Sequence, residues 1–236
     1  MSPPDLSNND SSVLSALFDP EASLSRNASI EDTLPSGVTL ENLKYLQLCE
    51  RDALHPINGE SPSVEEIETS ISKLTGIIDK NPCYASAYAN RAQARRMLFR
   101  DEQLPSQPAA VQQILQDLSR AIKIGTPEDS TQPLSSSHAK VLASAHTHRG
   151  YLLLLASKSD ANRQMLNCTP GLETLCPNQL EEAASREFAL GGRYGNDAAK
   201  QIAVRTNPYA KLCGSIVKEA LRKEISDYYQ PQVSTI

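Results

Sequence analysis

The clearest pattern of hydrophobic and polar positions lies between Ser63 and Pro82 and predicts an amphipathic helix. Ser63 followed by Glu66 is a capping box, in which each side chain can bond the backbone N–H of the other residue. Apolar residues then recur at intervals of three and four, which places them on one helical face: Ile67, Ile71, Leu74 and Ile78. Pro82 cannot continue a helix and marks its end.

The stretch from Asn81 to Met97 restarts the helical pattern and is the centre of the predicted fold. It is rich in Ala and Arg, which are both good helix formers. One stripe of it carries small and apolar side chains: Ala85, Tyr88, Ala92 and Met97. A second stripe follows at helical spacing: Val111, Ile114, Leu118, Ala121 and Ile122. Because alanines let a neighbouring helix approach closely, we expect a helical hairpin whose helices are joined by a polar loop over 101–108.

Further helices are predicted on both sides of this hairpin. Thr39–Leu54 precedes it, and Ala139–Ser157 follows it as the most apolar and therefore most central helix. The next helix is expected to start at a capping pair and to end at glycines: Asn178 with Glu181, then Gly191, Gly192 and Gly195. A short helix over Asp197–Arg205 comes next.

The last predicted helix begins at Asn207-Pro208, a cap followed by proline at the first helical position. Its apolar residues are expected to face inward: Tyr209, Leu212, Ile216, Ala220 and Ile225. Basic residues such as Lys218 and Arg222 then point outward, as in a helix that caps one end of a solenoid.

The first 36 residues are dominated by Ser, Asn, Asp and Pro and are expected to be a disordered tail. A short amphipathic segment, residues 10–20, interrupts this tail. Its apolar residues share one side of a helix: Val13, Leu14, Leu17 and Phe18. Burying them is worth about 1.5–3 kcal/mol per side chain, which is close to the cost of ordering the segment at ~1–2 kcal/mol per residue. We therefore expect a reversible latch on the folded body.

Composition and net charge argue against several kinds of partner and location. The net charge of −5 and the pI near 5.4 argue against nucleic acid as a partner, because nucleic-acid-binding proteins carry basic stripes. The five cysteines have no CxxC spacing, so reduced, partly buried thiols are expected instead of disulfides or zinc. Neither a signal peptide nor an apolar run long enough to span a membrane is present. We expect a soluble cytoplasmic protein, with the nucleus as a further location.

The predicted helices divide into a degenerate internal repeat. Small and large apolar residues recur at matching positions in three helical hairpins, close to the tetratricopeptide pattern of about 34 residues. The fold class is therefore all-α, a right-handed solenoid of three tetratricopeptide-type hairpins with a C-terminal cap. The three repeats cover 37–82, 83–125 and 138–195. A linker over 126–137 precedes the third repeat, which contains an internal loop over 158–177, and capping helices follow over 196–229.

Several stretches resemble the tetratricopeptide repeat protein 36 family. They are Leu17-Phe-Asp-Pro20, Ala85–Arg96, Asp117-Leu-x2-Ala121, Arg149-Gly150 and Asn207-Pro-Tyr-Ala-x-Leu-Cys213. The resemblance implies a three-repeat adaptor that binds the heat-shock seventy chaperone and is linked to tyrosine metabolism. Insertions at 55–62, 101–108 and 158–177 depart from the family pattern.

The first helix of each hairpin should line the concave side of the solenoid and form a peptide-binding groove. The candidate groove residues come from the second and third units: Ser86, Asn90, Gln93, Arg96, Met97, Thr147, His148 and Tyr151. Asn and Gln can pair with main-chain groups, Met and Tyr offer adaptable apolar contact, and Arg96 offers a fork for an acidic side chain.

The resemblance also raises the carboxylate clamp with which tetratricopeptide modules grip chaperone C-termini. Only Asn90 matches one of its five positions, since Leu46, Arg51, Ser144 and His148 stand at the other four. An asparagine here can equally hydrogen-bond the backbone of a neighbouring repeat, and the sequence leaves both readings open.

Nothing in the sequence predicts catalysis, a cofactor or a metal. Phosphate-binding loops, nucleophile elbows and zinc motifs are absent. His146 and His148 are two residues apart on one helix and are expected to be ordinary surface histidines. The basic cluster of Arg91, Arg95 and Arg96 is expected to form a solvated face paired with Asp or Glu, with contact to an acidic peptide as the alternative. Two functions remain: a non-enzymatic adaptor that binds a peptide or protein in its groove, or a regulatory partner that holds a metabolic enzyme through its convex face or last helix.

Overall fold

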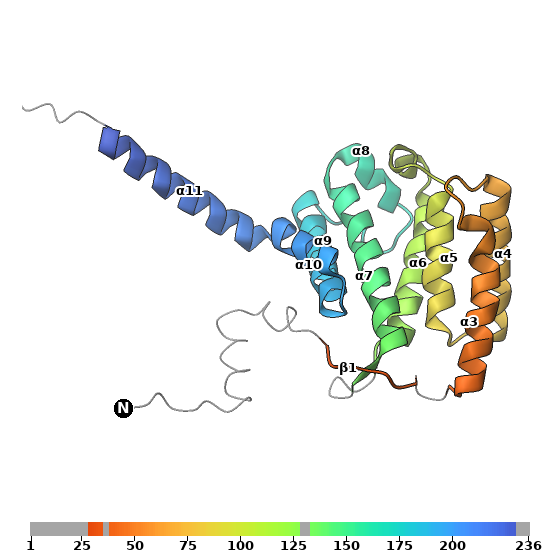
Figure 1. The fold of residues 1–236 in the computed structure, drawn as a ribbon. Helices are drawn as coiled ribbons and strands as arrows, with labels where there is room; N and C mark the ends of the chain where they lie inside the picture. The colour runs from red at the N-terminus through yellow and green to blue at the C-terminus, as the bar shows by residue number, and fades with distance from the viewer. Residues whose placement is uncertain (1–27, 35–37, 128–132, 230–236) are drawn as a thin grey trace, which may run out of the picture.

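A computed structural model describes residues 28–34, 38–127 and 133–229, with side chains of the last helix described at 214 and 216–226. The described chain is an all-α solenoid in which successive helices stand side by side (Figure 1). Its helices are α3 Leu40–Leu54, α4 Val64–Lys80, α5 Ala85–Met97, α6 Pro108–Gly125, α7 Ser136–Ser157, α8 Asp160–Arg163, α9 Pro177–Arg193, α10 Asp197–Thr206 and α11 Pro208–Tyr229. Short 3-10 helices occupy His55–Ile57, Asp101–Ser106 and Gln164–Leu166.

The predicted helix starts are set by side-chain caps. Ser63 and Glu66 form the expected capping box, with Glu66 N–H donating to Ser63 Oγ at 3.2 Å and Ser63 N–H to Glu66 Oε2 at 2.8 Å. Thr39 caps α3 and Asn196 caps α10 in the same way. These bonds satisfy backbone groups that the first turn of a helix leaves without partners.

The core lies between the helices and consists mainly of Ala, Leu and Ile. Ala87, Ala92 and Ala94 of α5 are completely buried, which lets α5 lie close to both α4 and α6. Leu74, Ile114 and Leu118 fill the spaces between the alanines and are 0–1% exposed. The all-α fold class is therefore confirmed, while the division into three tetratricopeptide repeats stays a prediction.

Two glycines expected to end α9 instead lie inside it. The helix continues through Gly191 and Gly192 to Arg193, and both glycines are buried against α7 and α10. A Cβ on Gly191 would lie 2.6 Å from Thr147 Oγ1, and one on Gly192 would lie 2.8 Å from Lys200 Cβ. Only Gly195, with φ of 105°, has the left-handed conformation of a helix end. The glycines are thus packing residues that bring α7, α9 and α10 together.

The insertions are more ordered than their polar composition indicates. Leu104 in the expected loop 101–108, and Met165 and Leu166 in the expected loop 158–177, are 0% exposed and belong to the core. The cap of α9 also differs from the prediction, because Cys176 occupies the N-cap and its N–H donates to Gln179 Oε1 at 3.0 Å. The pair Asn178 and Glu181 therefore lies inside the helix and does not cap it.

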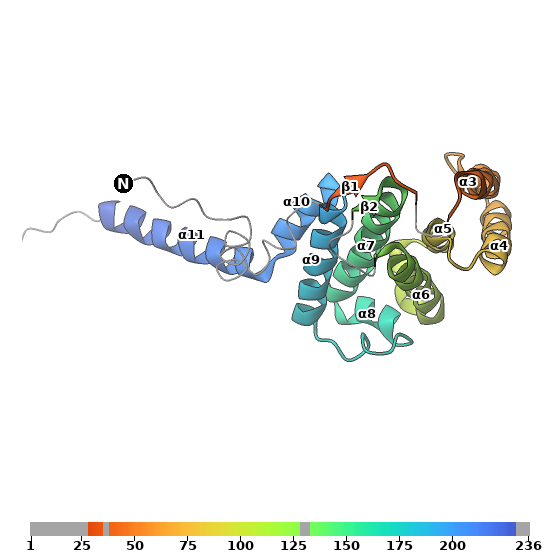
Figure 2. The same cartoon turned by 90° about the horizontal axis from the view of Figure 1, so that it is seen from below.

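The expected disordered tail is placed by specific contacts over 28–34. Ile30–Glu31 (β1) pairs in parallel with Leu134–Ser135 (β2), inside the stretch expected to be a linker. Ala28 N–H also donates to the carbonyl of Arg193 at 3.0 Å. Figure 2 shows β1 crossing beside the start of α7 on its way to α3. The amphipathic segment 10–20 lies outside the described residues.

The expectation that the last helix packs inward is wrong for its described side chains. Helix α11 extends away from the body (Figure 1), and Ile216, Val217, Leu221 and Ile225 are 53–58% exposed. Ala220, also expected inward, is exposed. The helix that covers α9 is α10. An amphipathic pattern predicts an apolar face but does not say what covers it.

Candidate peptide-binding groove

A cavity of about 880 Å³ lies between α5, α7 and the turn from α9 into α10. Six of the eight expected groove residues line it: Gln93, Arg96, Met97, Thr147, His148 and Tyr151. Gln93 and Ser144 are exposed within it, and Met97 and Tyr151 are 37% and 39% exposed. The two helix faces expected to share a groove therefore meet at one cavity.

The cavity also has a wall that the sequence patterns do not indicate. Tyr194, Gly195, Asn196 and Asp197 come from the turn after α9, and Ile202 comes from α10. Asn196 Nδ2 donates to Thr147 Oγ1 at 3.0 Å and fixes this turn to α7. Phe99 and Phe188 add apolar surface, so the cavity combines an aromatic and aliphatic lining with a few polar groups. This combination is typical of binding pockets.

Arg96 is not available as a fork for an acidic ligand, in contrast to the expectation. Its guanidinium donates to Asp101 Oδ1 and to the carbonyl of Phe99. Tyr151 Oη donates to the other carboxylate oxygen of Asp101. The three side chains close one end of the cavity and connect α7 to the loop after α5, so Arg96 shapes the groove.

His148 brings an unpartnered polar atom to the cavity. Its Nε2 is buried and has no hydrogen-bond partner. Burial, together with the nearby positive charge of Arg96, lowers the pKa of His148 to about 4. The imidazole is therefore neutral near pH 7 and can accept or donate one hydrogen bond at Nε2, depending on its tautomer.

His146, expected on the surface, is buried instead, with 4% exposed. Its Nδ1 lies 2.8 Å from Glu187 Oε2, and its ring stacks on Tyr194 with centroids 5.7 Å apart. Arg149 donates to the other oxygen of Glu187. Burial alone would raise the pKa of Glu187, but the hydrogen bonds from His146 and Arg149 outweigh it and lower the pKa below its usual value. This cluster fastens α7 to α9 and so positions Thr147 and His148.

Ser86 and Asn90 are placed apart from the other expected groove residues. Asn90 Nδ2 donates to Glu50 Oε1 at 2.8 Å, and Tyr84 Oη donates to Glu50 Oε2 at 2.9 Å. Asn90 therefore bonds a side chain of the preceding unit, the Glu50 carboxylate, instead of the expected backbone group. Ser86 lines a second cavity of about 940 Å³ between α3, the start of α5 and the start of α7.

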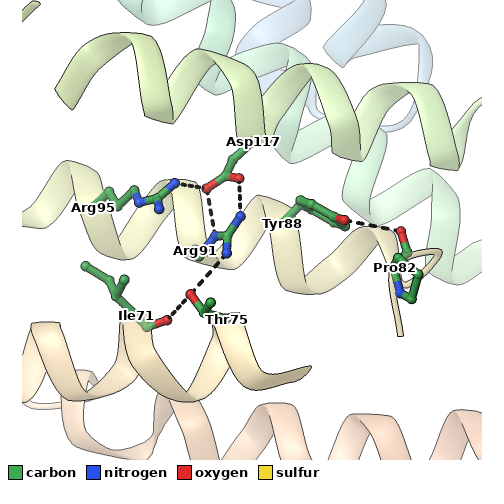
Figure 3. A network of polar contacts seen from close by, with 7 residues as sticks. All are labelled: Ile71, Thr75, Pro82, Tyr88, Arg91, Arg95 and Asp117. Atoms are coloured by element: carbon green, nitrogen blue, oxygen red, sulfur yellow. Dashed lines mark hydrogen bonds and ion pairs between the residues drawn. The ribbon is translucent and has the colours of Figure 1, made fainter. Parts of the chain in front are cut away.

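The expected solvated cluster of arginines is largely a buried ion-pair network (Figure 3). Arg91 donates to both carboxylate oxygens of Asp117, at 2.7 and 3.0 Å, and Arg95 donates to Oδ2 of the same carboxylate. Asp117 is 4% exposed, and Arg91 also donates to Thr75 Oγ1 at 3.0 Å. Arg91 and Arg95 therefore join α5 to α6 and α4 and do not face a ligand.

The described residues offer few other features for ligand binding, membrane insertion or thiol chemistry. Within 28–34, 38–127 and 133–229, no group of His, Cys, Asp and Glu side chains is arranged to hold a metal ion. Over the same ranges, no helix combines the length and hydropathy needed to cross a membrane. Of the four cysteines whose side chains the structure describes, Cys83, Cys168 and Cys176 are exposed free thiols and Cys49 is half-buried, as expected for all of them.

Comparison with known proteins gives a consistent set of relatives. The L-tyrosine degradation gene cluster protein hmgX of Aspergillus fumigatus is 41% identical over 241 aligned residues that cover 94% of each chain. Tetratricopeptide repeat protein 36 of Xenopus tropicalis is 26% identical over 91% of this chain and 87% of its own. The human protein of that name is 25% identical over 90% and 93%. No family model and no solved structure matches the chain.

Proposed function

Because this chain belongs to the family of the tyrosine-degradation cluster protein hmgX and, more distantly, of tetratricopeptide repeat protein 36, we propose that it is a non-enzymatic adaptor that binds a peptide or protein. The observation that carries this proposal is the cavity between α5, α7 and α10, to which both expected helix faces contribute. Its mixture of apolar walls and polar groups suits an extended or helical peptide. Neither relative is named as an enzyme.

The names of the relatives and the contacts of Asn90 both bear on which protein is the partner. The fungal relative is named for an L-tyrosine degradation gene cluster, so we infer that the partner is a protein of tyrosine degradation in the cytoplasm, with the nucleus as a second location. The heat-shock seventy chaperone is the other partner that the family resemblance implies. The Asn90–Glu50 bond weighs against a carboxylate clamp, since a carboxylate of the chain itself already occupies Asn90.

The test is affinity capture with a groove variant. Gln93→Ala, Met97→Ala and Ser144→Arg together remove contacts and fill the cavity while leaving buried residues unchanged. The control, Gln113→Ala with Gln116→Ala, changes exposed amides of α6, which do not line either cavity. The captured partner should be lost with the groove variant and kept with the control. Equal capture by both would contradict the adaptor proposal.

A second candidate function is favoured by α11. Its exposed apolar residues are what a helix offers to a partner, which supports a regulatory protein that holds a metabolic enzyme through its last helix. Leu221→Ser with Ile225→Ser should then abolish capture, while Val204→Ser, at the 64% exposed apolar residue of α10, should not. Loss with the α11 variant and retention with the groove variant would select this second function.

A further inference from the structure

The chain enters its described part at the edge of the groove. Ala28 N–H donates to the carbonyl of Arg193 at 3.0 Å, and the carbonyl of Ser29 accepts from Leu134 N–H at 2.8 Å. The residues that follow Arg193, from Tyr194 to Asp197, line the groove. The 27 residues before Ala28 are therefore attached directly beside it.

The length of this N-terminal stretch matches the groove. Lys140 and Tyr151 both line the cavity, and at 1.5 Å per residue they are ~16 Å apart along α7. As a helix, Asp10–Phe18 would be ~13 Å long. The nine residues 19–27 can span up to about 30 Å, which is enough to bring this helix to any part of the cavity.

The side chains of the segment 10–20 are also chemically suited to the groove. Val13, Leu14, Leu17 and Phe18 share one helical side and would meet the exposed parts of Met97 and Tyr151. The segment and its flank carry only acidic charge between residues 10 and 25: Asp10, Asp19 and Glu21. Among the exposed residues that line the groove, Lys140 near the start of α7 supplies a positive charge, and Asp197 at the start of α10 supplies a negative one.

An unsatisfied group in the groove points to an occupant as well. His148 Nε2 is buried without a hydrogen-bond partner, although buried polar atoms of folded proteins are normally bonded. The segment contains three hydroxyl groups on its polar positions: Ser11, Ser12 and Ser15. A hydroxyl can donate to or accept from the imidazole, whichever tautomer is present.

We propose that residues 10–20 of this chain occupy the groove between α5, α7 and α10 until a partner displaces them. The inference rests on the proposed function, because it makes the adaptor groove self-occupied. A short tether gives the segment an effective concentration on the order of millimolar, so even a weak contact keeps external ligands out. A partner must therefore bind more tightly than the chain's own segment.

The test uses full-length proteins and a fluorescein-labelled synthetic peptide of residues 8–22. Leu17→Ser with Phe18→Ser removes the apolar contacts of the attached segment, and Leu6→Ser with Leu24→Ser is the matched control outside it. Fluorescence anisotropy should show saturable peptide binding to L17S/F18S and binding at least ~10-fold weaker to the wild type and to the control. Adding Met97→Asp to L17S/F18S should remove the binding, with unchanged circular dichroism showing that the fold is intact.

Hydrogen exchange over 140–151 should be faster in L17S/F18S than in the wild type and in the L6S/L24S control. Equal peptide affinity for wild type and L17S/F18S, or no saturable binding together with unchanged exchange, overturns the self-occupancy. The proposed function is judged separately, by whether the groove variant loses the captured partner while the Gln113→Ala with Gln116→Ala control keeps it. A groove that captures a partner but ignores the peptide would therefore end this inference and leave the adaptor standing.

Discussion

Asp117 is the residue whose charge contributes most directly to holding α5 against α6. Its carboxylate is buried and bonded by Arg91 and Arg95, which are themselves only 12% and 22% exposed. Asp117→Ala leaves two partly buried cations without their partner, which should cost roughly 3–5 kcal/mol in the free energy of unfolding. Urea denaturation measures this change.

The exposed pair between Asp52 and Lys73 provides the control for Asp117. These side chains are 73% and 42% exposed, so solvent screens their attraction. Asp52→Ala should therefore leave the free energy of unfolding almost unchanged. A similar loss from both substitutions would mean that the Asp117 network is not the stabilising contact described above.

His148 makes stability depend on pH. Unfolded histidine binds a proton below about pH 6.5, whereas folded His148 does so only below about pH 4. Between these values the unfolded state binds more protons, so stability falls as the pH falls through this window. His148→Gln should therefore reduce the loss of unfolding free energy between pH 7 and pH 5 by about 2 kcal/mol.

The measurement for His148 is urea denaturation at both pH values. Burial also lowers the pKa of His138. The same experiment on His138→Gln therefore measures how much of the pH dependence of stability comes from His138. A His148→Gln protein with the same pH dependence as the wild type would show that the imidazole is not held neutral in the groove.

At the scale of elements, the close packing of α9 against α7 depends on glycine. Gly191→Ala places a methyl group 2.6 Å from Thr147 Oγ1 and should destabilise the protein by about 1–3 kcal/mol. Gly76 of α4 has nothing within 4 Å of the same position, so Gly76→Ala should be stabilising by about 0.5–1 kcal/mol through helix propensity. Thermal unfolding should therefore shift in opposite directions, and two shifts of the same sign would contradict the packing account.

The helices were predictable where local pattern and local caps agree. In α4, the capping box and the apolar spacing specify start, face and end from residues close in sequence. The pairing of Ile30 with Leu134 joins residues far apart in sequence and leaves no local signal. Met165 and Leu166 are buried within a polar stretch because α6 happens to pass beside them. For α11, the apolar pattern is the same whether the apolar face of the helix packs against the body or stays exposed.

At the scale of the whole molecule, the sequence predicts only part of the lining of the groove. Helical spacing identifies the faces of α5 and α7, which supply six of its residues. The wall formed by Tyr194–Asp197 and Ile202 depends on how α9 turns into α10, which the sequence pattern does not specify. The bond of Asn90 to Glu50 joins residues far apart in sequence and depends on tertiary contacts in the same way, whereas the bond of Arg96 to Asp101 depends on the conformation of the loop after α5.

The most direct test of the adaptor account is site-specific photo-crosslinking from inside the groove. A photoreactive phenylalanine analogue is placed at Ser144, which is exposed in the cavity, or at Gln116, which is exposed on α6. After irradiation in cells, mass spectrometry identifies what is attached at each position. The account predicts a discrete partner protein crosslinked from position 144 and not from position 116. The same partner crosslinked only from position 116, or only from α11, would contradict a binding site in the groove.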